Sequence, residues 1–315
     1  MASSKPFPLQ RGIISVLQTP FDATGRLDGE CLERLVENAI EGGVSGFLAP
    51  VVASEVAYLT EGEREAIVRR IATATRDRVS FIVGASSDDV AACRRQAALA
   101  EAVGASAYLV AIPDTLYGEP ASVIPFFADV AGGGSRLPLV IQDFQLNGPG
   151  LDVATIERLR EALPTMVGIK IETVPAGPKY TAVREVCGPE FFIAGGWAVS
   201  QMIEALDRGV DAMMPESSMV RVYAAIYRLY TGGQRDRALR VFRSLLPVLA
   251  FTNQEVGTSI AFFKRLLVRK GIFRNDAMRW PGFEWDQYNS RIADELIERY
   301  LELDDALEAE PVQGR

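Results

Sequence analysis

Lysine is scarce in this chain, and one lysine stands where it could do chemistry. The sequence holds 33 lysines and arginines, and only five of them are lysines. Lys170 lies in the apolar run 166–171 and is the only lysine in any run that we expect to form a strand. Burial disfavours the charged form of a lysine, and the neutral amine can attack a ketone to form a Schiff base. Alternatively, Lys170 could have a purely structural role, as the partner of a neighbouring carboxylate such as Glu172 in an ordinary ion pair.

Histidine is absent from the sequence, which narrows the possible catalytic groups. Ser-His-Asp and Cys-His mechanisms and zinc sites with histidine ligands are excluded. Cys31, Cys93 and Cys187 lie far apart, with no metal-ligand or disulfide spacing. We therefore expect no metal and no cofactor, and proton transfer by carboxylates, lysine, tyrosine, cysteine, the substrate or water.

The overall charge, the hydropathy and the cysteines bear on the partners and the cellular compartment of the protein. The formal net charge is −8, from 41 acidic and 33 basic residues, and no basic stripe is visible. We therefore expect a small-molecule substrate and no nucleic-acid partner. The first ten residues carry no apolar signal core, and the most apolar segments are of strand length or amphipathic, so no membrane association is expected. Three unpaired cysteines fit a reducing cytoplasm.

Short apolar runs alternate with stretches of helical length along most of the chain. Continuous apolar strands separated by helices indicate a parallel sheet covered on both faces. Eight such units predict an α/β fold, the (β/α)8 or TIM barrel. The eight runs lie at residues 13–17, 46–51, 79–84, 107–112, 137–141, 166–171, 191–194 and 211–214.

The pattern changes after the eighth run. Residues 234–251, 253–271 and 285–308 favour three helices with no strand between them. We predict a barrel over residues 8–232 and a C-terminal helical extension over 233–308, packed on the barrel.

The active site of such a barrel lies at the C-terminal ends of its strands. Side chains two residues apart on a strand face the same way, so Glu172 should point to the same side as Lys170. There it could move protons, or form a static ion pair with Lys170 or Lys179. Other candidates at the strand ends are Ala53, Ser54, Gln142, Asp143 and Gly195.

Several segments together resemble the dihydrodipicolinate synthase/N-acetylneuraminate lyase family. Residues 168–171, Gly-Ile-Lys-Ile, are similar to that family's Schiff-base lysine motif. Residues 19–21, 55–64, 84–86 and 279–281 are similar to its other segments, so the resemblance runs from about residue 8 to about residue 300. It implies a metal-independent class I lyase acting on a 2-oxo acid, with Lys170 forming the imine, and a homotetramer or dimer.

Two departures bear on the reaction. The family's usual Gly-Thr-Thr-Gly-Glu segment reads Val-Val-Ala-Ser-Glu at residues 51–55, and its usual tyrosine after the fifth strand is Gln142. The hydroxyl relay of the synthases is therefore missing, and dihydrodipicolinate synthesis is not expected. Residues 141–144 and 170–175, together with Lys179, resemble the 2-keto-3-deoxy sugar acid dehydratases of the same superfamily.

These residues predict a Schiff-base aldolase or dehydratase for 2-oxo acids such as 2-keto-3-deoxy sugar acids. Glu172 is the candidate acid/base, Ser54 and backbone amides near Ala53 are candidates for the substrate carboxylate, and Gln142 could hold a substrate hydroxyl or carboxylate. Asp143 and Ser54 could instead have positional roles, Gly195 could give clearance, and Glu55 could cap a loop or helix. The synthase reaction itself and an inactive barrel with a binding role remain alternatives.

Overall fold

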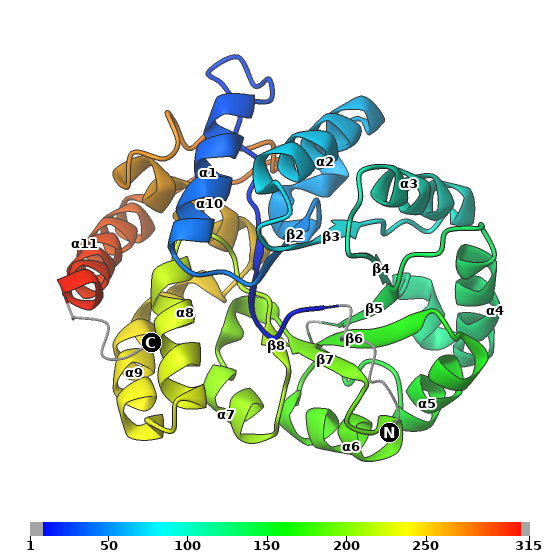
Figure 1. Cartoon of the computed structure of the whole chain (residues 1–315). Helices are drawn as coiled ribbons and strands as arrows, with labels where there is room; N and C mark the ends of the chain where they lie inside the picture. Colours follow the sequence, from blue (N-terminus) through cyan, green and yellow to red (C-terminus); the bar gives the residue numbers. More distant parts are fainter. Residues whose placement is uncertain (1–8, 146, 310–315) are drawn as a thin grey trace.

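Eight parallel strands form a closed barrel in the computed structural model, which describes residues 9–145 and 147–309 (Figure 1). Neighbouring strands pair in sequence order, and β1 pairs with β8 to close the ring. The predicted TIM barrel is therefore confirmed. The strands are β1 Gly12–Val16, β2 Gly46–Ala49, β3 Ser80–Gly84, β4 Ala107–Ala111, β5 Leu139–Phe144, β6 Met166–Glu172, β7 Phe192–Gly195 and β8 Ala212–Met213.

Helices follow the strands and surround the barrel (Figure 1). Asp28, Asp89 and Asp152 accept hydrogen bonds from the first turns of three of these helices, which explains where the helices begin. The barrel helices are α1 Gly29–Glu41, α2 Glu61–Thr75, α3 Val90–Ala102, α4 Pro120–Ala131, α5 Val153–Ala162, α6 Gly177–Cys187, α7 Met202–Asp207 and α8 Val220–Thr231. Short 3-10 turns are η1 Val52–Ser54, η2 Val56–Tyr58, η3 Asp114–Gly118 and η4 Trp197–Val199.

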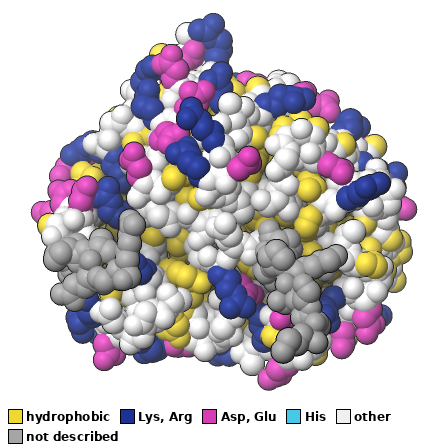
Figure 2. All heavy atoms as spheres, in the orientation of Figure 1, with side chains coloured by type: hydrophobic (Ala, Val, Ile, Leu, Met, Phe, Trp, Pro, Cys, Tyr) yellow, Lys and Arg dark blue, Asp and Glu magenta, His cyan; other side chains and the backbone are white. Residues whose placement is uncertain are grey.

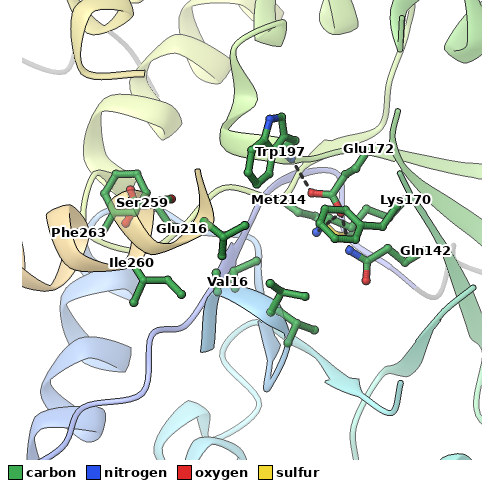
Figure 3. A pocket seen from close by; sticks show the side chains of 15 residues that line it. Val16, Gln142, Lys170, Glu172, Trp197, Met214, Glu216, Ser259, Ile260 and Phe263 are labelled. Atoms are coloured by element: carbon green, nitrogen blue, oxygen red, sulfur yellow. Dashed lines mark hydrogen bonds and ion pairs between the residues drawn. The ribbon is translucent and has the colours of Figure 1, made fainter. Parts of the chain in front are cut away.

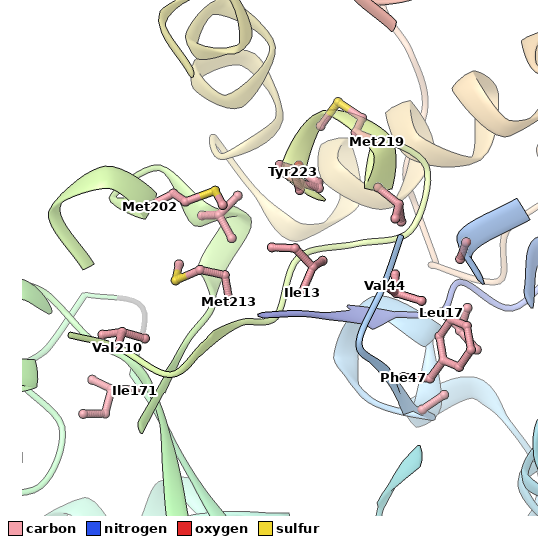
Figure 4. Close-up of a cluster of buried hydrophobic side chains, with 14 of the residues drawn as sticks. Ile13, Leu17, Val44, Phe47, Ile171, Met202, Val210, Met213, Met219 and Tyr223 are labelled. Carbon is pink, nitrogen blue, oxygen red and sulfur yellow. The ribbon is translucent and has the colours of Figure 1, made fainter. Parts of the chain in front are cut away.

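Alternate residues of each strand enter two different hydrophobic clusters. Ile14 and Leu48 belong to the cluster that fills the barrel interior. Their neighbours Ile13 and Phe47 belong to the larger cluster between strands and helices, where Tyr223 of α8 also lies (Figure 4). Both faces of the sheet are thus covered, which is why the strands read as continuous apolar runs rather than as alternating patterns.

Three more helices follow the barrel: α9 Arg235–Thr252, α10 Val256–Arg269 and α11 Gln287–Ala309. Their bounds lie within a few residues of the predicted ones. Helix α9 packs beside α8, and α11 packs on both (Figure 1). The division into a barrel and an extension stays a prediction.

Strands β5 and β6 run further than their apolar runs suggested. The polar pair Gln142 and Asp143 ended the predicted fifth run at Ile141, yet β5 continues to Phe144. Its last residues pair with β6, with Gln142 opposite Lys170 and Phe144 opposite Glu172. Ladder pairing therefore extends the strands past the point where the apolar pattern stops.

Charged side chains of both signs are interspersed over the face shown in Figure 2.

The three cysteines, Cys31, Cys93 and Cys187, lie in α1, α3 and α6, where all three are buried free thiols. No helix in the described part of the chain combines the length and the apolar character needed to cross a membrane.

Candidate active site

Lys170 lies on β6 with only 3% of its surface exposed, at the end of the barrel where the loops after the strands begin. Its Nζ is 2.9 Å from Oε2 of Glu172, and both side chains are buried. The prediction that Glu172 faces the same side as Lys170 is confirmed by this contact. The pairing of Glu172 with Lys179 is not observed, because Lys179 binds Asp143 instead.

The Glu172 carboxylate is held by donors from two further segments. Oε2 accepts a hydrogen bond from Nε2 of Gln142 at 2.5 Å, and Oε1 accepts one from the backbone N–H of Trp197 at 2.5 Å. Trp197 has φ 40°, a left-handed conformation that bulky residues rarely adopt. Three donors therefore fix the carboxylate beside the amine, and each comes from a different strand or loop.

A glycine after β7 leaves room for this pair. A Cβ placed on Gly196 would meet Oε1 of Glu172 at 2.1 Å and Cε of Lys170 at 2.6 Å. A Cβ on Gly195, the glycine named from the sequence, would instead meet Tyr180 and Met213. The clearance at the site therefore comes from Gly196, and Gly195 faces away from it.

A cavity opens over Lys170, with an empty volume of about 600 Å³ that includes open solvent. Figure 3 shows Gln142, Lys170, Glu172 and Trp197 together on one side of it. The lining comprises Val16, Val51, Val52, Ala53, Gln142, Phe144, Lys170, Glu172, Trp197, Met214, Glu216, Val256, Ser259, Ile260 and Phe263.

The candidate residues fall into two groups, according to whether their side chains line the cavity. Ala53, Gln142, Lys170 and Glu172 line the cavity together, while Ser54, Asp143 and Gly195 are not part of its lining. The hydroxyl of Ser54 donates to the Leu17 carbonyl at 2.6 Å and accepts from Val51 N–H at 3.1 Å. The structure therefore places Ser54 in a loop-shaping position.

Asp143 follows Gln142 on the same strand, β5, so its side chain points to the opposite face of the sheet, where it is buried. It accepts hydrogen bonds from Nζ of Lys179 at 2.5 Å and from the Tyr117 hydroxyl at 3.0 Å. Burial raises the pKa of Asp143, and the ammonium of Lys179 opposes that rise. This buried pair joins β5 to α6 and to η3, so it orients the strand that presents Gln142.

Glu55 is neither a simple loop residue nor only a cap. Its carboxylate is fully buried, pairs with Lys264 of α10 and accepts a 2.5 Å hydrogen bond from the backbone N–H of Arg279. Burial lowers the pKa of Lys264, while the charge of Glu55 opposes that shift. Lys264 and Arg279 both lie over the ring of Phe21, with 4.5 Å and 4.3 Å to its centroid.

Glu216, after β8, lines the cavity and received no role from the sequence. Its Oε2 accepts hydrogen bonds from Nε2 of Gln18 at 3.0 Å and from Ser218 N–H at 2.5 Å, and Oε1 accepts one from Met219 N–H at 3.2 Å. Burial raises the pKa of this carboxyl. The sequence did contain a signal for Glu216. It follows β8 in the same alternation as Ala212 and Met214, so its side chain could be expected to point into the barrel mouth.

The extension also reaches the site, which the sequence did not indicate. Val256, Ser259, Ile260 and Phe263 of α10 form one side of the cavity. Sequence spacing could identify an amphipathic helix but not the partner of its apolar face.

No group of three or more acidic or cysteine side chains in residues 9–145 and 147–309 is arranged to hold a metal ion. The arrangement at Lys170 places an amine capable of covalent attack beside a carboxylate capable of proton transfer, on the wall of an open cavity.

Comparison with known proteins gives a consistent result. The model of the Dihydrodipicolinate synthetase family matches residues 9–298. The L-2-keto-3-deoxyarabonate dehydratase of Azospirillum brasilense is 26% identical over 286 residues, which is 89% of this chain and 91% of that protein. The 4-hydroxy-tetrahydrodipicolinate synthase of a Chelativorans species is 34% identical over 246 residues, covering 76% of this chain and 81% of that one.

Solved structures agree with these matches. The dihydrodipicolinate synthase of Rhodopseudomonas palustris superposes with a TM-score of 0.87 at 25% identity, covering 94% of this chain and 99% of that one. The sialic acid aldolase of Ruminococcus gnavus shares the fold, with a TM-score of 0.86 at 17% identity over 94% and 99% of the two chains. The resemblance found in the sequence is confirmed: the chain belongs to the dihydrodipicolinate synthetase family, and it is one of that family's lyases.

Proposed function

We propose that this lyase acts on 2-oxo acids that carry a hydroxyl at C4, with Lys170 forming the imine and Glu172 transferring the proton. The observation that carries the proposal is the buried contact of 2.9 Å between Lys170 Nζ and Glu172 Oε2 at the floor of the cavity. The similarity to an L-2-keto-3-deoxyarabonate dehydratase makes 2-keto-3-deoxy sugar acids the first class to assay.

The chemistry follows from the two side chains. Glu172 takes a proton from Lys170, the neutral amine attacks C2 of the substrate, and Glu172 returns the proton to the carbonyl oxygen, which leaves as water. The imine then accepts an electron pair from C3. In a dehydration Glu172 removes a C3 proton and gives it to the C4 hydroxyl, which leaves as water. In an aldol cleavage Glu172 removes the C4 hydroxyl proton, the C3–C4 bond breaks, an aldehyde leaves, and the enamine takes the proton back at C3. In both routes water then hydrolyses the imine, which releases the 2-oxo acid product and frees Lys170.

The remaining residues of the site position these two. Gln142 and Trp197 N–H hold the Glu172 carboxylate in place. We assign Gln142 a second role, contact with a substrate hydroxyl or carboxylate, and we assign the substrate carboxylate to the backbone beside Ala53, which lines the cavity. Ser54 supports that backbone through its hydrogen bonds.

Trapping the imine tests the proposal. Pyruvate or a 2-keto-3-deoxy acid with borohydride should add one adduct mass, which peptide mass spectrometry should locate on Lys170. Lys170→Ala should abolish both adduct and turnover, while Lys270→Arg, a lysine away from the cavity, should keep both. An adduct on Lys179 or Lys264, or no adduct with any 2-oxo acid, would contradict the proposal, and the second result would favour a binding role.

The synthase reaction is the second candidate, because a synthase is 34% identical to this chain over 246 residues. Gln142 and Val52 stand where hydroxyl side chains would be expected in a synthase, and Gln142 can neither donate nor accept a proton as an acid or base. A coupled assay with pyruvate and aspartate semialdehyde should therefore give negligible turnover. Turnover comparable to that with the best sugar acid would reverse the order of the two candidates.

We further propose that the protein works in the cytoplasm as a homotetramer or dimer, without a nucleic-acid or membrane partner. The acidic net charge of −8 and the mixed charges on the face in Figure 2 support the absence of a nucleic-acid partner. Light scattering coupled to size-exclusion chromatography would measure the assembly, and a 34.4 kDa particle would contradict it.

A further inference from the structure

We propose that the cavity selects 2-oxo acids whose chain beyond C4 is uncharged and apolar, and that helix α10 of the extension makes this selection. The inference rests on the proposed function and narrows its substrate class. It concerns the end of the substrate that lies away from the imine on Lys170.

The cavity has two chemically different ends. Gln142, Lys170 and Glu172, all from β5 and β6, make the reacting end. Figure 3 shows Ile260 and Phe263 of α10 on the opposite side, with Val16 and Glu216 between. The other hydrophobic members of the lining are Val51, Val52, Ala53, Phe144, Trp197, Met214 and Val256.

Helix α10 presents one continuous face to this end. Its lining residues are Val256, Ser259, Ile260 and Phe263, at relative positions i, i+3, i+4 and i+7, which lie along one side of a helix. The next residue, Lys264, is tied through its buried ion pair to Glu55, directly after η1. The apolar face is therefore fixed in position relative to Val52 and Ala53, on the neighbouring side of the cavity.

Charge disfavours an anionic substrate tail. Among the described residues that line the cavity, Lys170 is the only cation, and the imine uses it. The other ionisable lining groups are the carboxyls of Glu172 and Glu216. A second substrate carboxylate would thus be buried without a counter-ion and beside two acidic groups, which is a large energetic penalty.

Hydrogen bonding disfavours a polyol tail. Both oxygens of Glu216 already accept hydrogen bonds from Gln18, Ser218 and Met219. Ser259 then supplies the one hydroxyl among the described lining residues. Several tail hydroxyls would lose their water partners and find few replacements, whereas a hydrocarbon tail gains from burial.

Three acids of equal length test the proposal on the unmodified protein. They are 4-hydroxy-2-oxohexanoate, 2-keto-3-deoxygluconate and 4-hydroxy-2-oxoadipate, with a hydrocarbon, a dihydroxylated and an anionic tail on the same reacting end. Substrate loss measured by mass spectrometry covers both cleavage and dehydration. We expect kcat/KM for the hexanoate to exceed that for the sugar acid by about 10–100-fold and that for the dianion by more.

The outcomes separate this inference from the proposed function. Equal or better turnover of the sugar acid or the dianion, with the imine still trapped on Lys170, would overturn the inference alone. Failure to trap an adduct with any of the three acids would overturn both.

A charge placed on α10 supplies a second test. Val256→Arg brings a cation to the partly exposed rim of the apolar end, and the ratio of kcat/KM for the dianion to that for the hexanoate should rise at least about 10-fold. Val268→Arg, also at a partly buried position of α10 but outside the lining, is the matched control and should leave the ratio unchanged. An unchanged ratio in folded Val256→Arg would remove α10 from substrate selection.

Discussion

The Glu172 carboxylate contacts three donors. Oε2 pairs with Lys170 Nζ and accepts a hydrogen bond from the Gln142 amide, and Oε1 accepts one from the Trp197 N–H. Glu216 and Asp143 each accept three hydrogen bonds as well, so the number of donors does not by itself mark a catalytic group. Glu172 differs from both because it lines the cavity in direct contact with the lysine that lies there. This position favours a carboxylate held in a fixed geometry for proton transfer.

Glu172→Gln keeps the shape of this side chain and removes the base. The variant should still form the borohydride-trapped adduct, because the amine of Lys170 survives, while turnover should fall by roughly 10²–10⁴-fold. Measuring trapping rate and turnover on the same preparation separates the two steps. Glu190→Gln, an exposed carboxylate before β7, serves as the control.

Unchanged turnover in Glu172→Gln would assign the carboxylate to a static ion pair. Faster imine formation with the same turnover would support that reading, because the amine of Lys170 would then lose the charge that favours its protonated form. The proton carrier would in that case be a water or another group of the cavity.

At the scale of elements, the segment after α10 is joined to the start of α2. The guanidinium of Arg279 donates to both carboxylate oxygens of Glu63, at 2.9 Å and 2.6 Å, and to the carbonyls of Tyr58 and Gly25. The hydrogen bonds from Arg279 are the main reason that the pKa of Glu63 falls to about 2. Thr60 and Glu63 also form the capping box of α2.

Glu63→Gln should destabilise the fold in a pH-dependent way. The pKa of Glu63 is lower in the folded state than in the unfolded state, so its contribution is complete above about pH 4.5 and is lost as the pH falls towards 2. Glutamine still fits the capping box, so the variant isolates the charge. Urea unfolding should show a loss of about 1–3 kcal/mol at pH 7, shrinking at pH 4 and below. A difference that stays constant with pH would contradict the assignment.

The elements that could be predicted are those whose signal is local. Eight buried strands gave eight apolar runs, and alternation along β6 placed Glu172 beside Lys170. Pairings between distant positions left no such signal. Glu55 and Lys264 are 209 residues apart, and neither position shows its partner. The direction of Asp143 could not be assigned because the polar pair at residues 142–143 hid the true end of β5.

At the scale of the whole molecule, the barrel and the extension share one core. Tyr223 and Ile226 of α8 are fully buried in the same hydrophobic cluster as Phe262 and Leu266 of α10. The active site also needs both regions, because α10 of the extension forms one side of the cavity. Two regions that share a core and a site should fold as one unit.

A fragment of residues 9–232 should therefore fail to reach a native state. Removing α9, α10 and α11 would expose the buried face of α8 and one side of the cavity, so the fragment should lack near-UV circular dichroism and a cooperative urea transition. The complete chain should unfold in a single transition. A fragment with a sharp transition of its own would show that the predicted boundary near residue 232 separates independent domains.

The described lysines are almost completely withdrawn from the surface. The exposed fractions of their side chains are 4% for Lys170, 7% for Lys179, 1% for Lys264 and 11% for Lys270. Among the described residues, arginine supplies nearly all the exposed positive charge, and a guanidinium does not form the imines that a primary amine forms with ketones and aldehydes. The described surface therefore offers few primary amines to the 2-oxo acids of the proposed reaction. A 2-oxo acid with borohydride should accordingly label Lys170 with little background on the described part of the outer surface.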